Sequence, residues 1–309
     1  WHLQFIRQST LPQKLVLNNG TEIPIIGLGT YSLSDQPYEA IKKGVRLFDC
    51  AEFYKNEEVI GKSIKKALDE KIVKREELYI ISKIWPTNYD NIEGSLTQSL
   101  KDLQVEYVDL YMLHWATRVY DNEKKEFQRI PLHKIWATLE GLVRKGLIKS
   151  LGISNFNVQI LIDLLTYCEI KPVVNEFEVH PYWNRKGLVD FCQRNSINII
   201  AYGSLVKGGY TTRYVTENSY NLVKEKVIVD MAKKYGKTEN QIAINWALSQ
   251  NIIAIPRSSN IDRITSNYES ANFRMTKEDI EEINKLNCDK RFCDNMDEWE
   301  KYGCFDIFA

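Results

Sequence analysis

The chain has 309 residues, of which 44% are hydrophobic and 27% are charged, as is typical of globular proteins, and this excludes a disordered chain, a collagen-like chain and a coiled coil. Its 41 basic residues balance its 41 acidic residues, which excludes an overall basic surface for nucleic acid. No apolar run approaches the roughly 18 residues that a membrane-spanning helix needs, so we expect neither a nucleic-acid partner nor a membrane.

The termini and the cysteines indicate how many domains the chain has and where the protein is located. Residues 1–13 lack an initiator methionine and the apolar core of a secretory signal, and we interpret them as an extension or as residues added in cloning. We expect residues 14–309 to form one domain. Six cysteines without a CxxC pair favour a reducing, cytoplasmic location. The four scattered histidines do not have zinc-ligand spacing, so no metal is expected.

The first predicted element is a hairpin, because Asn18-Asn19-Gly20 lies between two strand-like runs, Lys14–Leu17 and Glu22–Pro24, and Asn-Gly favours a tight turn. Eight short, largely apolar runs follow, as expected for strands buried in a parallel sheet. They are Ile25–Gly29, Leu47–Asp49, Leu78–Ser82, Val108–Leu113, Ile148–Ile153, Val173–Phe177, Ile199–Ala201 and Ile252–Ile255.

Helical patterns alternate with these runs, with apolar residues near a 3.6-residue period. They are Gln36–Lys43, Glu57–Glu70, Ile92–Leu103, Leu132–Lys145, Val158–Tyr167, Lys186–Gln193, Gln241–Ser249, Ile261–Ser266 and Lys277–Leu286. Ser154-Asn155 and Thr238 are predicted helix caps.

Eight strand–helix units predict a (β/α)₈ barrel, an α/β fold, with the hairpin as a lid over its N-terminal mouth. The tail from Cys288 to Ala309 is rich in aromatic residues and is expected to pack on the barrel, with one of its mouths as a candidate. A dinucleotide-binding doubly wound sheet is the weaker alternative, because Gly27-Leu28-Gly29 lacks the third glycine of that fingerprint.

Four polar residues lie at the ends of successive predicted strands, where side chains of a barrel enter the active-site mouth. They are Asp49, Tyr54, Lys83 and His114. Taken singly, each has an available structural role, such as a cap, a packing ring or a buried histidine. Together they suit proton transfer, because an ammonium stabilises a phenolate and lowers the phenol pKa. A carboxylate would keep the buried ammonium charged, and an external hydride donor would complete the chemistry.

These residues resemble the aldo-keto reductase family, in particular the aldose and xylose reductases. The resemblance runs from about Leu15 into the tail and is carried by residues 48–57 (FDCAEFYKNE), 82–85 (SKIW) and 113–115 (LHW). It implies a catalytic tetrad of Asp49, Tyr54, Lys83 and His114. It also implies NADPH, with NADH possible, bound across the barrel mouth.

The resemblance implies a set of cofactor-binding residues. Ser154 and Asn155 would hold the nicotinamide carboxamide, and Tyr202 would stack on the ring. The residues implied along the rest of the cofactor are Gly29, Thr30, Glu176, Ser204, Leu205, Arg257, Ser258, Arg263 and Asn267. Independently, arginines after the eighth strand suit bidentate phosphate recognition.

This chain departs from the family pattern at three of these positions. Arg257 replaces the usual lysine and leaves use of both cofactors open, and Ser266 replaces a glutamate that often contacts the adenine. Glu176 replaces a glutamine. We hypothesise that an ionised Glu176 favours the oxidised ring, whereas a protonated one mimics the amide.

The resemblance also implies a substrate pocket of Tyr31, Trp85, Trp115 and Trp299, bordered by residues 123–131. The predicted function is NADPH-dependent reduction of aldehydes, including aldoses, and some ketones, with Tyr54 as proton donor and a small carbonyl compound as partner. A monomer or weak homodimer is expected. The alternatives are a cofactor-sensing auxiliary subunit of potassium channels and an NAD(P)⁺-linked alcohol dehydrogenase.

Overall fold

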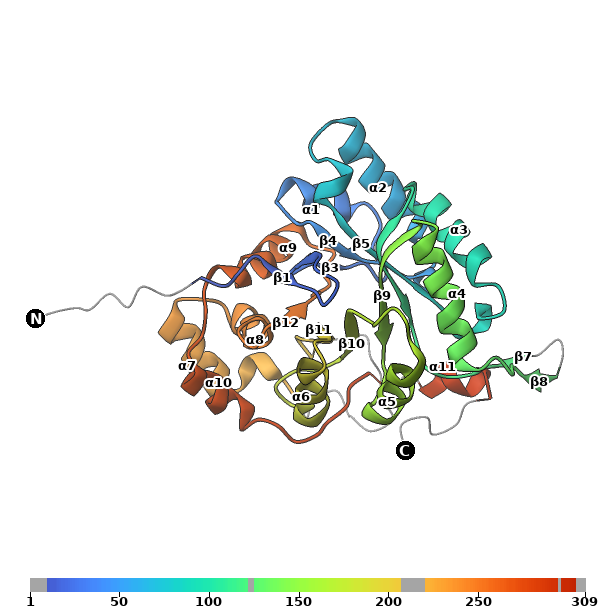
Figure 1. Cartoon of the computed structure of the whole chain (residues 1–309). Helices are drawn as coiled ribbons and strands as arrows, with labels where there is room; N and C mark the ends of the chain where they lie inside the picture. The colour runs from blue at the N-terminus through green and yellow to red at the C-terminus, as the bar shows by residue number, and fades with distance from the viewer. Residues whose placement is uncertain (1–9, 122–124, 207–219, 294–295, 304–309) are drawn as a thin grey trace, which may run out of the picture.

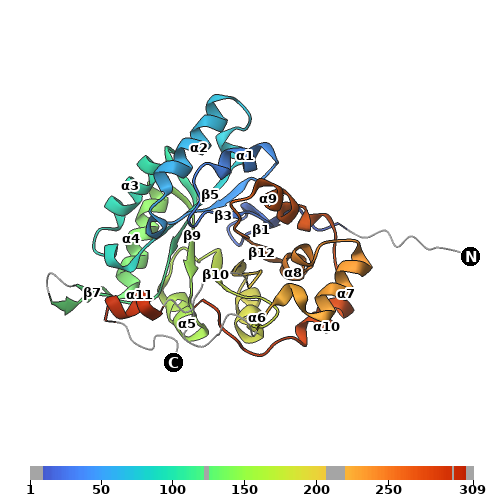
Figure 2. The ribbon, with the colours of Figure 1, turned by 180° about the vertical axis from the view of Figure 1, so that it is seen from behind.

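The structure is a computed structural model that describes residues 10–121, 125–206, 220–293 and 296–303. Helices surround a central barrel of strands (Figure 1, and from behind in Figure 2). Residues 1–9 of the extension and the tail aromatics Phe305 and Phe308 lie outside the described residues.

Eight parallel strands form the barrel. They are β3 (Leu28–Gly29), β4 (Leu47–Asp49), β5 (Tyr79–Ile84), β6 (Val108–Leu113), β9 (Ile148–Ser154), β10 (Val174–Glu178), β11 (Asn198–Tyr202) and β12 (Ile252–Ala254). Each pairs with the next along the barrel in the order β12-β11-β10-β9-β6-β5-β4-β3, and a parallel bridge between Ile26 and Ala254 joins the two ends. The predicted barrel is confirmed, and its eight strands lie where the sequence placed them.

The α-helices lie around the outside of the barrel, except for the last one, which belongs to the tail. They are α1 (Gln36–Lys42), α2 (Glu57–Asp69), α3 (Ile92–Leu103), α4 (Leu132–Arg144), α5 (Val158–Tyr167), α6 (Lys186–Arg194), α7 (Lys226–Tyr235), α8 (Glu239–Leu248), α9 (Ile261–Tyr268), α10 (Lys277–Asn284) and α11 (Met296–Lys301). Short 3-10 helices are η1 (Glu52–Tyr54), η2 (Arg75–Glu77), η3 (Pro86–Asn88), η4 (Leu222–Lys224) and η5 (Glu269–Asn272).

Two helices were not predicted. The helix α7 buries Ile228, Met231 and Ala232, a spacing of three and four residues that periodicity could have revealed. The helix α11 has six residues, too few for a periodic signal.

One of the two predicted helix caps is confirmed. Thr238 accepts a hydrogen bond from the Gln241 amide at 3.2 Å, and the Gln241 side chain accepts one from the Thr238 amide at 3.1 Å. The prediction of Ser154-Asn155 as a cap is wrong, because the Asn157 side chain caps α5 by accepting from the Ile160 amide. Ser154 ends β9, and Asn155 bends the chain with a φ of 61°, so both side chains belong to the barrel mouth.

The predicted hairpin forms from β1 (Lys14–Val16) and β2 (Glu22–Pro24), and it closes the N-terminal mouth. Leu17 and Ile23 are buried in the same cluster as the barrel's interior side chains. Asn19 donates a hydrogen bond to the Ser150 hydroxyl at 2.8 Å, and Asn18 donates one to the Pro172 carbonyl at 2.9 Å. The turn is therefore tied to the starts of the barrel strands.

Alternate residues along each strand point to different cores. Ile81 and Met112 share the interior cluster, whereas their neighbours Ile80 and Tyr111 belong to the large cluster that includes buried helix residues. Lys83 lies two residues after Ile81 and so points into the barrel. The interior therefore changes from apolar to polar toward the strands' carboxyl ends, which is where a barrel carries its chemistry.

A second hairpin, β7 (Tyr120–Asp121) and β8 (Glu126–Phe127), occupies the long segment after β6. It lies beside α11 in both ribbon views (Figure 1, Figure 2). The Tyr120 amide donates a hydrogen bond to the Tyr302 carbonyl at 2.9 Å. The tail is thereby held next to the loop that follows the fourth barrel strand.

The contact between α2 and α3 depends on a glycine. A Cβ added at Gly61 would lie 2.1 Å from the carbonyl oxygen of Asp102, whereas one at Gly141 in α4 would have no atom within 4 Å. We expect Gly61→Ala to lower the free energy of unfolding by about 1–3 kcal/mol through overpacking. Gly141→Ala should raise it by about 0.5–1 kcal/mol, because alanine favours a helix. Urea unfolding of both variants checks this, and equal effects would contradict the close packing of α2 on α3.

Candidate active site

The ammonium of Lys83 is the centre of the polar cluster in the barrel mouth. It is fully buried and donates hydrogen bonds to a carboxylate oxygen of Asp49, to the Tyr54 hydroxyl at 3.2 Å and to the Cys50 carbonyl at 3.3 Å. A second carboxylate, Glu176, lies 3.3 Å away. Burial opposes the charge, but Asp49 and Glu176 outweigh it and raise the pKa of Lys83 above its ordinary value. The ammonium is therefore a permanent buried cation.

Tyr54 reaches this cation from η1, a single turn after β4. Lys55 ends the turn in the left-handed region with a φ of 55°. The Asn56 side chain then donates to the carbonyls of Thr30 and Leu33 at 2.8 and 2.9 Å, which ties the turn to the loop after β3. The Tyr54 hydroxyl also lies 3.5 Å from Asp49, and the phenol oxygen is therefore held beside both members of the buried ion pair.

His114 follows β6 and completes the set. Its ring packs edge-on against Tyr54, with centroids 5.9 Å apart, and against Trp85 at 5.1 Å. Burial, followed by the charge of Lys83, lowers the pKa of His114 well below its ordinary value. The imidazole is therefore neutral at neutral pH, and its Nδ1 has no hydrogen-bond partner within the described residues. The structure thus brings together all four residues predicted as the tetrad.

On the other side of the mouth, β9, β10 and β11 form a polar network. The Ser154 hydroxyl donates to the Glu176 carbonyl at 3.0 Å, and Tyr202 donates to the Asn155 side-chain oxygen at 2.7 Å. Asn155 in turn donates to the His114 carbonyl at 3.0 Å. Four of the predicted cofactor residues are therefore adjacent to the tetrad. The contact of Glu176 with Lys83 was not predicted, because β10 and β5 are distant in sequence.

The predicted residues near β3 lie against the loop after β12. Gly29 allows close contact, since a Cβ there would lie 2.8 Å from the Ile255 carbonyl oxygen. Thr30 is buried and donates to the Asp49 carbonyl at 2.8 Å. Arg257 donates to the carbonyls of Tyr31 and Ser32 at 3.1 and 3.0 Å.

The segment predicted to bind the adenosine phosphate surrounds the start of α9. The Asn260 side chain caps this helix by accepting from the Arg263 amide at 2.9 Å, and Ser258 and Asn267 are buried. Arg257 and Arg263 are exposed at this helix N-terminus, a position that favours anions. Ser204 and Leu205 follow β11, and residues 207–219 beyond them are not among the described residues.

An aromatic cluster forms the wall beside His114. Trp299 of α11 stacks on Trp85 with centroids 5.3 Å apart and packs edge-on against Trp115 at 4.8 Å. Phe53, which was not predicted, also stacks on Trp85, with ring centroids 3.9 Å apart. The fourth predicted substrate residue, Tyr31, is half-exposed and contacts the Tyr54 ring at 5.3 Å. The tail therefore packs on the C-terminal mouth of the barrel.

A buried glutamate anchors the tail to this mouth. Glu178 accepts hydrogen bonds from the backbone amides of Phe292 and Cys293 at 2.7 and 3.0 Å, and its Oε1 lies 2.9 Å from His180 Nε2. This anchor was not predicted. The alternation of Glu176, Glu178 and His180 along and beyond one strand was the available signal.

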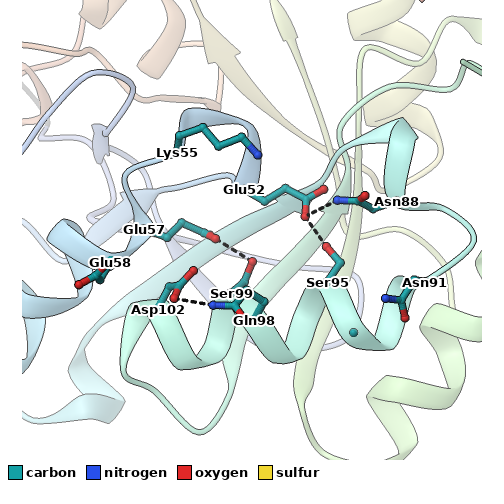
Figure 3. Close-up of a pocket in the computed structure, with 11 residues that line it drawn as sticks. Glu52, Lys55, Glu57, Glu58, Asn88, Asn91, Ser95, Gln98, Ser99 and Asp102 are labelled. Carbon is teal, nitrogen blue, oxygen red and sulfur yellow. Dashed lines mark hydrogen bonds between the residues drawn. The ribbon is translucent and has the colours of Figure 1, made fainter. Parts of the chain in front are cut away.

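A hollow of about 470 Å³ lies on the outer side of the strands that carry Asp49 and Lys83, between η1 and α3. Figure 3 shows Glu57 directed at Ser99, and Glu52 directed at Asn88 and Ser95. Glu57 also accepts from the Ser82 hydroxyl at 2.5 Å, and burial raises its pKa to about 7. Glu57 thus holds β5 from behind at Ser82, one residue before Lys83.

The part of the chain that the structure describes contains no helix long and apolar enough to cross a membrane. Within the same residues there is no group of three or more histidine, cysteine or acidic side chains that could hold a metal ion.

Comparison with known proteins places this site in a family. Residues 27–288 match the model of the aldo/keto reductase family. The chain belongs to this family. An NADH-dependent D-xylose reductase from Candida parapsilosis is 37% identical over 94% of this chain and 97% of that protein. An NADPH-dependent D-xylose reductase from Meyerozyma guilliermondii is 36% identical over 94% and 99%, and aldose reductase C from Dictyostelium discoideum is 36% identical over 90% of each chain.

The enzyme is therefore an NAD(P)H-dependent oxidoreductase that reduces carbonyl groups. The residues of this mouth fit a nicotinamide cofactor. The Oε2 atom of Glu176 is buried without a hydrogen-bond partner among the described residues, and it lies beside the Ser154–Asn155–Tyr202 network. The exposed arginines at α9 suit the phosphates of the same molecule.

The anchoring role of Glu178 predicts a loosened tail in Glu178→Gln. An amide offers one oxygen instead of two, and its NH₂ group would face a backbone donor. We expect protease cleavage near residues 290–303 at least about tenfold faster, since a charged hydrogen bond contributes about 1.5–3 kcal/mol. The exposed Glu281→Gln is the control. Equal cleavage rates in the two variants would show that Glu178 does not hold the tail.

Proposed function

We propose that this enzyme reduces aldehydes, including aldoses, with Tyr54 as the proton donor to the carbonyl oxygen. The observation that carries the proposal is the contact of the Tyr54 hydroxyl with the buried ammonium of Lys83 at 3.2 Å. A positive charge at this distance stabilises the phenolate that remains after the proton leaves. Asp49 keeps Lys83 charged in a place without water, where an unpaired ion would cost several kcal/mol.

His114 has a positioning role in this proposal. Because its burial lowers the pKa of the ring, it does not compete with Tyr54 as an acid at neutral pH. Its neutral ring would instead orient the carbonyl oxygen by donating one hydrogen bond. The edge-on contact with Tyr54 is consistent with both groups acting on the same atom.

The cofactor would be held by Ser154, Asn155, Glu176 and Tyr202 at its nicotinamide end. When bound in its reduced form, it supplies the hydride for the carbonyl carbon. Arg257 and Arg263 would bind a 2′-phosphate, which supports preference for NADPH. The relatives include enzymes named for NADH and for NADPH, so dual use is part of the proposal.

The aromatic wall supports a small carbonyl substrate. Trp85 and Trp299 each bury an indole N–H without a partner among the described residues. Such donors can bind sugar hydroxyl groups while the rings pack on the C–H faces. The relatives named as D-xylose reductases support aldoses as one substrate class. We also propose a cytoplasmic location, in keeping with cysteines that are free within the described residues.

The proton-donor role is tested by Tyr54→Phe with D-xylose and a simple aldehyde as substrates. We expect the reduction rate to fall by at least about 10²-fold, because general acid catalysis contributes about 10²–10⁴. NADPH should still bind, since the ring remains. The matched control is Tyr38→Phe in α1, where the lost hydroxyl bonds only to exposed Glu70. A near-wild-type rate in Tyr54→Phe refutes the assignment.

The phosphate role is tested by Arg257→Ala. We expect the dissociation constant of NADPH to rise about 10-fold or more, as for a lost charged hydrogen bond. That of NADH should rise less, through loss of the contacts to Tyr31 and Ser32 alone. Fluorescence titration with both cofactors measures this, and exposed Arg194→Ala is the control. An equal loss of affinity for both cofactors would show that Arg257 supports the loop of Tyr31 and Ser32 and does not bind the phosphate.

A further inference from the structure

The buried cluster around Lys83 contains two carboxylates for one ammonium. Asp49 comes from β4 and Glu176 from β10, and both are at most 2% exposed. They contact the same Lys83 nitrogen from different strands. No second buried cation faces this cluster among the described residues. If both acids were ionised, the site would carry one uncompensated negative charge, which is costly in a place without water.

One proton relieves this excess, and the contacts indicate which acid takes it. Asp49 has a hydrogen bond from Lys83 and lies 3.5 Å from the Tyr54 hydroxyl. Glu176 lies 3.3 Å from the Lys83 nitrogen, and its Oε2 atom has no hydrogen-bond partner within the described residues. Burial, followed by the charge of Asp49, raises the pKa of Glu176 to about 8. Glu176, the acid with a carboxylate oxygen that lacks a hydrogen bond, is thus the one that holds the proton at neutral pH.

The other strands beside Glu176 do not alter this balance. The paired positions on β9 and β11 are Ser154 and Ile200, neither of which is charged. Tyr202 follows on β11 and donates its hydroxyl to Asn155. His114 is neutral because its pKa is lowered. The charges that act on Glu176 are therefore those of Asp49, of Lys83 and of whatever binds in the mouth.

A nicotinamide ring changes this balance when its oxidation state changes, because the oxidised ring is a cation and the reduced ring is neutral. We propose that Glu176 is a proton-linked redox sensor, which holds its proton beside the reduced cofactor and releases it when the oxidised cofactor binds. This inference rests on the proposed function, since it requires the ring to lie beside Glu176. The exchange is balanced: protonated enzyme and oxidised cofactor give the ionised complex and one free proton.

The linkage has a defined consequence for affinity. Between the pKa of Glu176 in the complex with the oxidised cofactor and its pKa in the free enzyme, binding of the oxidised cofactor should tighten about tenfold for each unit of rising pH, because one proton leaves. Binding of the reduced cofactor should not show this dependence. Glu176 therefore makes low pH favour the reduced cofactor in the site, and high pH the oxidised one. Glu176 acts on the bound cofactor through the balance of charge between Asp49, Lys83 and the ring.

The test counts protons during binding to the full chain. Isothermal titration calorimetry at pH 7, in buffers with different ionisation enthalpies, gives the protons released with NADP⁺ and with NADPH. The two cofactors share the 2′-phosphate and the adenine, so their difference isolates the ring. We expect the wild type to release about one proton more with NADP⁺ than with NADPH. We expect Glu176→Gln to show no difference.

Three further results keep the proposal falsifiable. A wild type that shows no proton difference overturns it, however the variant behaves. An unchanged difference in Glu176→Gln assigns the proton to another group and also overturns it. Glu57→Gln, which changes a buried glutamate with a raised pKa on the outer side of β5, should leave the difference intact. Failure of the proposed function would look different, because neither cofactor would then bind or Tyr54→Phe would remain active.

Discussion

The buried ammonium of Lys83 is the group on which the rest of the site depends. An isolated cation in this position would lose its proton, since removal from water costs several kcal/mol. The carboxylate of Asp49 prevents this, and the charge that it preserves acts on the Tyr54 oxygen at 3.2 Å. The same burial lowers the pKa of His114. Within one buried site, Lys83 is thus kept charged and His114 is kept neutral.

The barrel holds this arrangement rigidly. Lys83 is part of β5, and β5 pairs with β4 on one side and β6 on the other, the strands that carry Asp49 and lead to His114. Behind β5, Glu52 and Glu57 accept hydrogen bonds from Trp85 and Ser82, which lie on either side of Lys83 at the end of this strand. Glu178 holds the tail, which brings Trp299 against the aromatic wall. Buried hydrogen bonds of Glu52, Glu57 and Glu178 therefore hold the elements that surround Lys83.

The sequence predicted the barrel because the signal is local and repeated. Each strand is a short apolar run followed by a periodic helix, and such patterns need no knowledge of distant contacts. The proximity of Asp49, Tyr54, Lys83 and His114 could also be predicted, since these residues follow successive strands. The contact between Glu176 and Lys83 could not, because it crosses the barrel interior between strands that are not neighbours. For the same reason, the cap of α5 was misplaced: Asn155 turns toward the mouth to bond His114 and Tyr202.

The charge on Lys83 can be tested directly with Lys83→Met, which keeps an unbranched side chain one atom shorter and removes the ammonium. Single-turnover measurement of NADPH oxidation at saturating aldehyde separates the chemical step from cofactor exchange. The arrangement around Lys83 predicts a fall of at least about 10²-fold in that step, with NADPH still bound. A rate close to that of the wild type would contradict it, because the phenol of Tyr54 would then act without its cation.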